Sequence, residues 1–475
     1  MIKKKLLKGD TKNTLRFIES ALEVIILSVV YFAIWKLCYS VNSFPAYLGN
    51  GKLLLTAVYA VLCWLFIKNS DGFRFGNLKI SELGIAQWIG LAIVNVITYF
   101  QLCLIANKMI NPLPMIGLML ADMLIATLFV FCYNNLHRRL YAPHNMIMIF
   151  GRETAVGMKI KMDKLKEKYQ VTKLISADEG LDAICEKIKD FESVIINDVE
   201  AELRNDILKY CYENGIRTYV IPKITDIIMR GASPVTAFDT PMLLVNGTGL
   251  NVGQRFLKRA MDIAISLIGL IVASPIMLVV ALAIKLEDKG PVFYKQKRVT
   301  LNGDVFEILK FRSMIVNAEK DGLSIPATGK DPRITKVGNI IRATRIDELP
   351  QIINILKGDM SIVGPRPERV EHVEKYSEEI PEFAYRLKVK GGLTGYAQIY
   401  GKYNTSAYDK LRLDLMYIEN YSIFLDIKLI ILTVRIMLSK ESTEGFDVAE
   451  ANERKLHSLL NELHEKGSIT EDTEE

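Results

Sequence analysis

The sequence IAISLIGLIVASPIMLVVALAI, residues 263–284, holds no charged side chain, and its 22 residues are enough to cross a bilayer. Basic residues flank it on both sides, which favours the cytoplasmic side for both ends. Ser274 and Pro275 interrupt it near the middle, and a proline bends a helix because it removes a backbone hydrogen bond. We therefore predict a re-entrant helix over 263–286, with a proline-kinked spanning helix as the alternative. The flanking basic residues are Arg255, Lys258, Arg259, Lys285, Lys289, Lys295, Lys297 and Arg298.

The composition indicates a membrane protein. Of 475 residues, 50% are hydrophobic, and the mean hydropathy is +0.19. The six cysteines show no close spacing, which argues against both a disulfide framework and a metal cluster. A net charge of +6 is modest for this length, so nucleic acid is not predicted as a partner.

Four apolar runs occupy the first 140 residues, each close to the length of a membrane-spanning helix. Basic residues gather before the first run, between the second and third, and after the fourth. This alternation predicts a four-helix transmembrane domain over residues 1–140, with both ends in the cytoplasm and no cleavable signal peptide. Glu19 and Glu23 in the first run mark either an intramembrane site or the cytoplasmic interface, and we favour the interface. The runs are 17–39, 53–67, 83–104 and 115–133.

From residue 145 the pattern is that of a soluble α/β module, in which short apolar runs alternate with polar helical stretches. It predicts a small Rossmann-like parallel sheet over 145–235, followed by a linker over 236–253. Gly151 and Gly157 follow the first strand, but the second glycine of a dinucleotide loop is missing and Glu153 would repel phosphate. We expect a structural or regulatory module, with nucleotide binding as the alternative. The expected strands are 146–150, 171–175, 193–196 and 218–221.

Residues 347–351 (DELPQ) open a helical pattern, and Pro350 is tolerated only in a first turn, so the helix is predicted to start near Asp347. Asp347 and Glu348 have two interpretations at such a start. Asp347 could cap the helix while Glu348 complements its dipole. Alternatively, one carboxylate attacks phosphorus and the other holds a divalent cation. Spacing alone leaves both open. The apolar positions are Leu349, Ile352, Ile353 and Leu356.

Seven motifs in residues 254–440 match one family. This stretch resembles the catalytic domain of the bacterial sugar transferase family, the polyprenyl-phosphate glycosyl-1-phosphate transferases. The four apolar runs and the Rossmann-like module before it are similar to the large, exopolysaccharide-initiating subgroup. The motifs are Ser274-Pro275, KFRSM at 310–314, DPR at 331–333, Arg342, DELPQ at 347–351, GPRP at 364–367 and GLTG at 392–395.

The resemblance implies an α/β membrane protein with an N-terminal four-helix transmembrane bundle, a small Rossmann-like parallel-sheet module, and a C-terminal α/β catalytic domain with a re-entrant membrane helix. The implied reaction moves a sugar 1-phosphate from a nucleotide sugar, usually a UDP sugar, to a polyprenyl phosphate such as undecaprenyl phosphate. Nucleoside monophosphate is released. Exopolysaccharide, capsule or O-antigen assembly begins with this step.

Residue roles also follow from the resemblance. Asp347 matches the nucleophile that becomes a phosphosugar ester, and Glu348 matches the ligand of Mg²⁺. Ser274 and Pro275 match the break of the re-entrant helix. The residues expected to bind substrate phosphates are Arg342, Arg366, Lys310, Arg312, Arg298 and Arg333.

The implied location is the bacterial inner membrane, with several spans and with the soluble domains in the cytoplasm. The partners are then the nucleotide sugar, the polyprenyl phosphate and the bilayer, and a homo-oligomer is compatible with them. The polar tail over 441–475 is predicted to be dispensable for chemistry, with a helical stretch near 451–464. The alternative functions are a non-catalytic membrane scaffold or nucleotide sensor and, with less support, a sugar-nucleotide dehydratase or epimerase built on the Rossmann-like unit.

Two positions depart from the family pattern. Thr300 stands where a glycine is usual, and Gly391 stands where a proline is usual. Neither position belongs to the carboxylate pair, so the departures concern the shapes of the surrounding loops.

Overall fold

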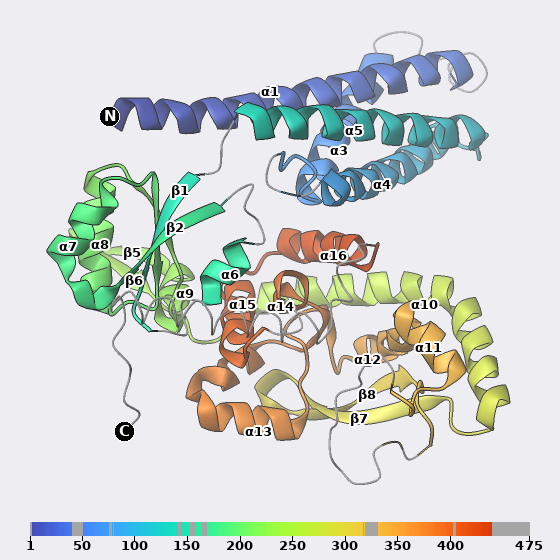
Figure 1. Cartoon of the computed structure of the whole chain (residues 1–475). Helices are drawn as coiled ribbons and strands as arrows, with labels where there is room; N and C mark the ends of the chain where they lie inside the picture. The colour runs from blue at the N-terminus through green and yellow to red at the C-terminus, as the bar shows by residue number, and fades with distance from the viewer. Residues whose placement is uncertain are drawn as a thin grey trace. The chain divides into compact units, whose positions relative to one another are not determined.

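The computed structural model describes residues 2–39, 51–75, 78, 80–140, 144–152, 157–163, 169–316, 318, 331–401 and 405–438 (Figure 1). The helix predicted near 451–464 and the acidic Glu153 lie outside these residues. The chain divides into two compact units, with the main boundary between Ile221 and Pro222.

Long apolar helices begin the first unit, as the sequence predicts. They pack on one another through buried side chains such as Leu27, Tyr59 and Leu91. Five helices among the described residues are long and apolar enough to cross a membrane, four of them here and the fifth in the second unit. Their arrangement as a membrane-spanning bundle stays a prediction. The four are α1 (Ile2–Ile34), which continues as the π-helical η1 (Trp35–Tyr39), α3 (Gly51–Asn69), α4 (Ile80–Ala106) and α5 (Leu113–Leu140).

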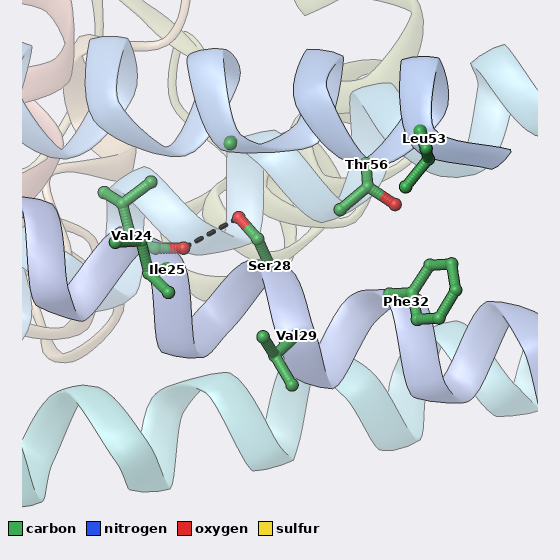
Figure 2. A pocket seen from close by; sticks show the side chains of 8 residues that line it. Val24, Ile25, Ser28, Val29, Phe32, Leu53 and Thr56 are labelled. Atoms are coloured by element: carbon green, nitrogen blue, oxygen red, sulfur yellow. Dashed lines mark hydrogen bonds between the residues drawn. The ribbon is translucent and has the colours of Figure 1, made fainter. Parts of the chain in front are cut away.

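Buried polar contacts join these helices. Glu19 Oε2 lies 2.7 Å from His137 Nε2, and Gln87 Nε2 donates to Glu23 Oε2 over 3.1 Å. The two glutamates are 1% and 0% exposed, so both lie between helices. A pocket of about 270 Å³ also opens between α1 and α3, and Figure 2 shows its lining, which is apolar apart from Ser28 and Thr56.

The predicted parallel sheet is confirmed. Its four strands run in the order β2-β1-β3-β4, and all neighbouring pairs are parallel. The central strands are buried along almost their whole length, as expected for a sheet that is covered on both faces. The strands are β1 (His144–Phe150), β2 (Tyr169–Ser176), β3 (Ser193–Asn197) and β4 (Arg217–Val220), and the helical elements are α6 (Gly157–Asp163), η4 (Ala177–Glu179), α7 (Leu181–Ile188) and α8 (Ala201–Glu213).

Gly151 has a packing role at the end of β1. A Cβ atom there would lie 2.1 Å from the carbonyl oxygen of Asp198, so only glycine allows the two backbones to approach this closely. The end of β3 therefore requires glycine at position 151. This packing role favours a structural module over a nucleotide-binding one.

Helices predominate among the described residues of the second unit, which also form three two-stranded sheets. The sequence predicts a linker over 236–253, but β6 and the end of β5 form a hairpin there. The elements are α9 (Ile224–Arg230), β5 (Ser233–Ala237), β6 (Thr240–Leu244), α10 (Val252–Asp288), β7 (Phe293–Val299), η5 (Leu301–Gly303), β8 (Val305–Phe311), α11 (Lys336–Ala343), η6 (Ile346–Glu348), α12 (Gln351–Lys357), β9 (Ser361–Val363), α13 (Val370–Glu379), η7 (Pro381–Lys388), β10 (Gly392–Thr394), α14 (Tyr396–Tyr400), α15 (Ala407–Glu419) and α16 (Ile423–Leu438).

The helix α10 contains the Ser274-Pro275 pair and bends along its course in Figure 1. Pro275 has no N–H with which to bond the carbonyl of Ile271, four residues earlier. The Ser274 hydroxyl donates to this same carbonyl over 2.9 Å. The serine therefore compensates for the hydrogen bond that the proline removes, which explains why the two residues occur together.

Both ends of α10 contact the same unit. Near the start, Arg259 donates to the carbonyls of Ile355 and Leu356 at the end of α12, over 2.5 and 2.7 Å. Near the other end, Glu287 accepts hydrogen bonds from the first amides of α11, and Asp288 pairs with Arg312. Between these ends, apolar side chains such as Ile271 and Val272 are mostly exposed.

Candidate active site

Asp347 and Glu348 lie in the 3-10 turn η6, and not in the α-helix that the sequence predicts there. The helix α12 begins only at Gln351, because Pro350 occupies its N-cap and Arg345 adopts a left-handed backbone with φ 59° before the turn. Neither N-cap residue makes a side-chain capping bond. The α-helix therefore starts four residues after the start predicted near Asp347, and of the two interpretations of the carboxylates the capping role of Asp347 is wrong.

The burial of α12 also differs from its predicted amphipathic pattern. Its buried residues are Gln351, Asn354 and Ile355, two of them polar. Asn354 accepts from the Leu309 amide over 2.9 Å and donates to the Glu307 carbonyl over 2.8 Å, so the polar side of α12 is bonded to β8. The apolar side instead faces α10, where a Cβ at Gly269 would lie 3.7 Å from Ile352 Cδ1.

Glu348 binds two cations through one oxygen. Lys310 Nζ donates to Glu348 Oε1 over 2.8 Å, and Arg366 Nη2 donates to the same atom over 3.3 Å. Burial by itself would raise the pKa of this carboxyl, but Arg366 and Lys310 outweigh it and hold the pKa at about 2. Glu348 is therefore a carboxylate at every physiological pH. Its second oxygen, Oε2, accepts no hydrogen bond from the residues that the structure describes.

Asp347 differs from its neighbour. Within the described part of the chain it accepts no hydrogen bond, and its side chain is partly exposed. Burial raises its pKa above the ordinary value, against the attraction of Lys310. The adjacent residues thus provide one carboxylate that is neutralised by bound cations and one whose oxygens are free to react.

Arg366 projects from the GPRP segment, which follows β9. The segment is held close to β10: Gly364 N donates to the Thr394 carbonyl, and Gly392 N donates to the Pro365 carbonyl, both over 2.8 Å. A Cβ at Gly364 would lie 2.4 Å from the Lys390 carbonyl oxygen, so this close approach requires glycine. The backbone that carries Arg366 is thereby fixed against the rest of the domain.

The predicted phosphate-binding residues fall into two groups. Lys310 and Arg366 meet at Glu348, and the charge of Arg342 acts on Asp347 without a hydrogen bond to any described residue. The other three bind protein groups other than Asp347 and Glu348. Arg298 donates to the Pro367 carbonyl over 3.0 Å, Arg312 pairs with Asp288, and Arg333 lies 2.6 Å from Asp331.

The surroundings of Asp331 and Arg298 shift the pKa values of these two residues. Hydrogen bonds from Arg333 lower the pKa of Asp331 to about 2. Burial lowers the pKa of Arg298 to about 10, and the nearby positive charge of Arg366 adds to the effect. Arg298 therefore lies close to the site, although its hydrogen bonds go to protein atoms.

Sequence reasoning missed two residues that shape the site. Asn354 connects α12 to β8, and Arg386 bonds the main chain of Arg366. Asn354 lies in the predicted helix as an ordinary polar residue, and Arg386 lies in a stretch of mixed charge. Neither has a signal in local spacing, because each is defined by partners far away in the sequence.

The second unit thus combines a long bent apolar helix with a carboxylate pair among basic side chains, which defines a membrane-associated class of protein suited to phosphate chemistry. The family model described as Bacterial sugar transferase matches residues 253–440. Among known proteins, the UDP-glucose:undecaprenyl-phosphate glucose-1-phosphate transferase of Escherichia coli is 45% identical over 211 residues, which are 43% of this chain and 44% of that protein.

Two further relatives extend this comparison. The UDP-N-acetylgalactosamine-undecaprenyl-phosphate N-acetylgalactosaminephosphotransferase of Aeromonas hydrophila is 45% identical, over 39% of this chain and 44% of its own. The UDP-glucose:undecaprenyl-phosphate glucose-1-phosphate transferase of Caulobacter vibrioides is 40% identical, over 39% and 71%. The chain belongs to the bacterial sugar transferase family. It spans about half the length of the first curated relatives that it matches.

The two departures from the family pattern contact each other. The amide of Gly391 donates to Thr300 Oγ1 over 3.0 Å, and the Thr300 hydroxyl is also 3.2 Å from the Asp359 carbonyl. A proline at position 391 would have no N–H, and a glycine at position 300 would have no hydroxyl. The hydrogen bond therefore requires both departures at once, and it lies beside Pro367 of the segment that carries Arg366.

Proposed function

We propose that the protein transfers a sugar 1-phosphate from a UDP sugar to undecaprenyl phosphate at the cytoplasmic face of the membrane, and that UMP is released. The step would begin exopolysaccharide, capsule or O-antigen assembly. The observation that carries the proposal is the difference between two adjacent carboxylates. Glu348 is held by Lys310 and Arg366, whereas Asp347 is left without a hydrogen-bond partner among the described residues.

In the proposed first step, a carboxylate oxygen of Asp347 attacks the phosphorus that bears the sugar. The bond from this phosphorus to the oxygen that bridges the two phosphates breaks, and UMP leaves with that oxygen. Asp347 then carries the sugar phosphate as a covalent acyl phosphate. Arg342, Arg366 and Lys310 reduce the repulsion between a carboxylate and a diphosphate, which would otherwise oppose the attack.

In the second step, an oxygen of undecaprenyl phosphate attacks the same phosphorus and expels the Asp347 carboxylate. The product is the sugar linked through a diphosphate to the lipid, and the enzyme returns to its starting state. Both steps break one phosphorus–oxygen bond and form another, so neither requires an oxidant or a reductant. Asp347 is therefore the nucleophile of the first step and the leaving group of the second.

The donor set also fits Mg²⁺. This ion takes one or two carboxylates and completes its coordination with water and substrate phosphates, so it needs no cluster of three protein ligands. No such cluster exists among the described residues. Glu348 would hold the ion through Oε2, which the cations on Oε1 leave free. When bound, Mg²⁺ would neutralise the developing charge on the diphosphate oxygens.

A re-entrant α10 is the proposed membrane anchor of this site. As a straight helix its 37 residues would extend about 55 Å, beyond the roughly 30 Å hydrocarbon core. The bend of α10 in Figure 1, the exposed apolar side chains between its two ends and the contacts of both ends with one domain support the proposal. The lipid phosphate would then meet a soluble donor at the cytoplasmic interface.

Cysteine labelling tests the topology of α10. Val252→Cys and Lys295→Cys, made in a variant whose six native cysteines are serine, are expected to react with a membrane-impermeant maleimide in inverted vesicles but not in intact cells. Both chosen side chains are exposed, at 82% and 60%. Lys108→Cys, in a loop predicted to lie outside, is the opposite control. Reaction of Lys295→Cys in intact cells would make α10 a spanning helix.

A doubly labelled donor tests the reaction. Purified full-length protein in lipid nanodiscs is incubated with undecaprenyl phosphate, Mg²⁺ and UDP-glucose or UDP-N-acetylgalactosamine that carries ³H in the sugar and ³²P in the β-phosphate. Both labels are expected in the lipid product in equal amounts, with one UMP released per sugar. Transfer of ³H alone, with UDP as the product, would indicate a sugar transferase that leaves both phosphates on the nucleotide.

The same assay separates the enzyme from its alternative. A non-catalytic scaffold or nucleotide sensor would transfer neither label from any donor of a broad panel. Addition of EDTA should abolish the transfer, and excess Mg²⁺ should restore it. Transfer at an undiminished rate in EDTA would remove the metal from the proposal and leave the basic residues as the only neutralising groups.

A further inference from the structure

Arg386 is a buried cation that the reaction as described does not use. It lies on η7 and is 2% exposed. Its partner is Asp414 on α15, where Nε and Nη2 of the guanidinium lie 2.9 and 2.7 Å from Asp414 Oδ2. Burial of such a pair costs desolvation energy, and packed apolar side chains of the same size often stabilise a fold as well or better. Core stability alone therefore gives a weak explanation for Arg386.

The guanidinium of Arg386 lies over the ring of Phe383, 5.0 Å from its centroid, and a further contact leads to the active site. Its Nη2 donates to the main-chain carbonyl of Arg366 over 2.9 Å. The next carbonyl along, that of Pro367, accepts from Arg298 over 3.0 Å. The buried guanidinium of Arg386 and the partly buried one of Arg298 thus hold consecutive carbonyls of the GPRP segment, while the side chain of Arg366 reaches Glu348 over 3.3 Å.

Both guanidiniums also lie near one carboxylate. Glu368 Oε1 is 3.9 Å from Arg386 Nη1, and Glu368 Oε2 is 3.9 Å from Arg298 Nη1. At this distance Glu368 contributes attraction without a hydrogen bond. The segment that carries Arg366 is therefore fixed by a charged framework behind it, in addition to the backbone bonds to β10.

We propose that Arg386, neutralised by Asp414, is a positioning residue that holds the main chain of Arg366 so that the Arg366 guanidinium meets Glu348 and the donor phosphate. The planar guanidinium explains the choice of residue. Its fixed fork bonds Asp414 and the Arg366 carbonyl at once, whereas the single ammonium of lysine on a flexible stem has no such fixed geometry. The catalytic part of this inference rests on the proposed function.

Arg386→Lys tests the inference because it keeps the buried charge and removes the fork. We expect kcat/KM for the UDP sugar to fall by about 10- to 100-fold, the range seen when a residue that orients an active-site group is changed. The fall should lie mainly in KM, because Arg366 loses its orientation toward the donor. The Tm of the purified protein should change little.

The split between KM and kcat gives a readout that a purely structural role would not move. A loss of folded protein would lower the apparent kcat at an unchanged KM, whereas a displaced Arg366 guanidinium raises KM.

Arg412→Lys is the matched control. Arg412 also donates to a backbone carbonyl, that of Pro222 over 3.3 Å, and to a carboxylate, that of Asp409 over 2.6 Å, but it does not touch the GPRP segment. It should leave KM unchanged. A wild-type KM in Arg386→Lys would overturn the inference.

Hydrogen exchange tests the positioning role of Arg386 independently of the proposed function. Amides of residues 361–368 should exchange faster in Arg386→Lys than in the wild type or in Arg412→Lys, whether or not any variant transfers sugar phosphate. Absence of transfer by the wild type would contradict the proposed function alone. Unchanged exchange over 361–368 would contradict the positioning role alone. Should Arg386→Lys fail to fold, Asp414→Asn removes the anchoring charge instead and is expected to give the same faster exchange, with slow exchange again counting against the role.

Discussion

Asp347→Asn is expected to lower kcat by roughly 10³-fold or more while the protein folds normally, because an amide has the size of the carboxylate but does not attack phosphorus. The side chain makes no hydrogen bond to the described residues, so its replacement breaks no structural contact. The measurement is the rate of ³²P transfer to lipid, together with Tm as the check on folding. Asp304→Asn, in the exposed turn after η5, is the matched control and should keep wild-type activity.

Detection of the covalent intermediate tests the role of Asp347 more directly. Wild-type protein given donor and Mg²⁺ without undecaprenyl phosphate should release close to one UMP per active site and gain the mass of one sugar phosphate on the peptide that contains Asp347. Asp347→Asn should do neither. Full turnover of the wild type without such an adduct would favour direct attack by the lipid phosphate, and Asp347 would then be a base or a metal ligand.

Glu348→Gln is expected to lower kcat by roughly 10²-fold or more, for a different reason. The change removes the negative charge that Lys310 and Arg366 neutralise, and it removes the carboxylate proposed to bind Mg²⁺. Excess Mg²⁺ should therefore restore part of the activity of Glu348→Gln and none of that of Asp347→Asn. A Mg²⁺ titration of both variants measures the contrast.

The control for Glu348→Gln is Glu307→Gln. This change removes an exposed carboxylate on β8 that pairs with Lys295 on β7. Surface ion pairs of this kind contribute little to stability, so activity and its Mg²⁺ dependence should stay as in the wild type. An unchanged Mg²⁺ requirement in Glu348→Gln would assign the metal to another group and leave Glu348 as a counter-ion for the two cations.

The four strands of the sheet module and the long apolar helices are predictable because each depends on local pattern. A buried parallel strand appears as a short continuous apolar run, and the expected strand 146–150 lies within β1. The Ser274-Pro275 pair is also visible locally, and the structure adds its reason, since the serine hydroxyl bonds the carbonyl that the proline leaves free.

Counting basic residues in the sequence overstates the topological signal at the start of α10. Lys258 and Arg259 count among the basic residues that favour the cytoplasmic side at the start of α10. In the structure Lys258 is 5% exposed and pairs with Asp426 over 2.6 Å, while Arg259 bonds the end of α12. Both charges have partners within the domain, so their presence has a tertiary explanation as well as a topological one.

The sequence alone determined the family resemblance, the bent apolar helix and the carboxylate pair, because each is a property of residues that are neighbours in the chain. Only the tertiary structure decided which cations serve the pair. Lys310 and Arg312 lie two residues apart, yet one binds Glu348 and the other pairs with Asp288. Glu348 lies 38 residues from Lys310, and Arg386 lies 20 residues from the carbonyl that it holds. Such contacts depend on how β8, η6 and η7 pack in space, and local spacing carries no record of that packing.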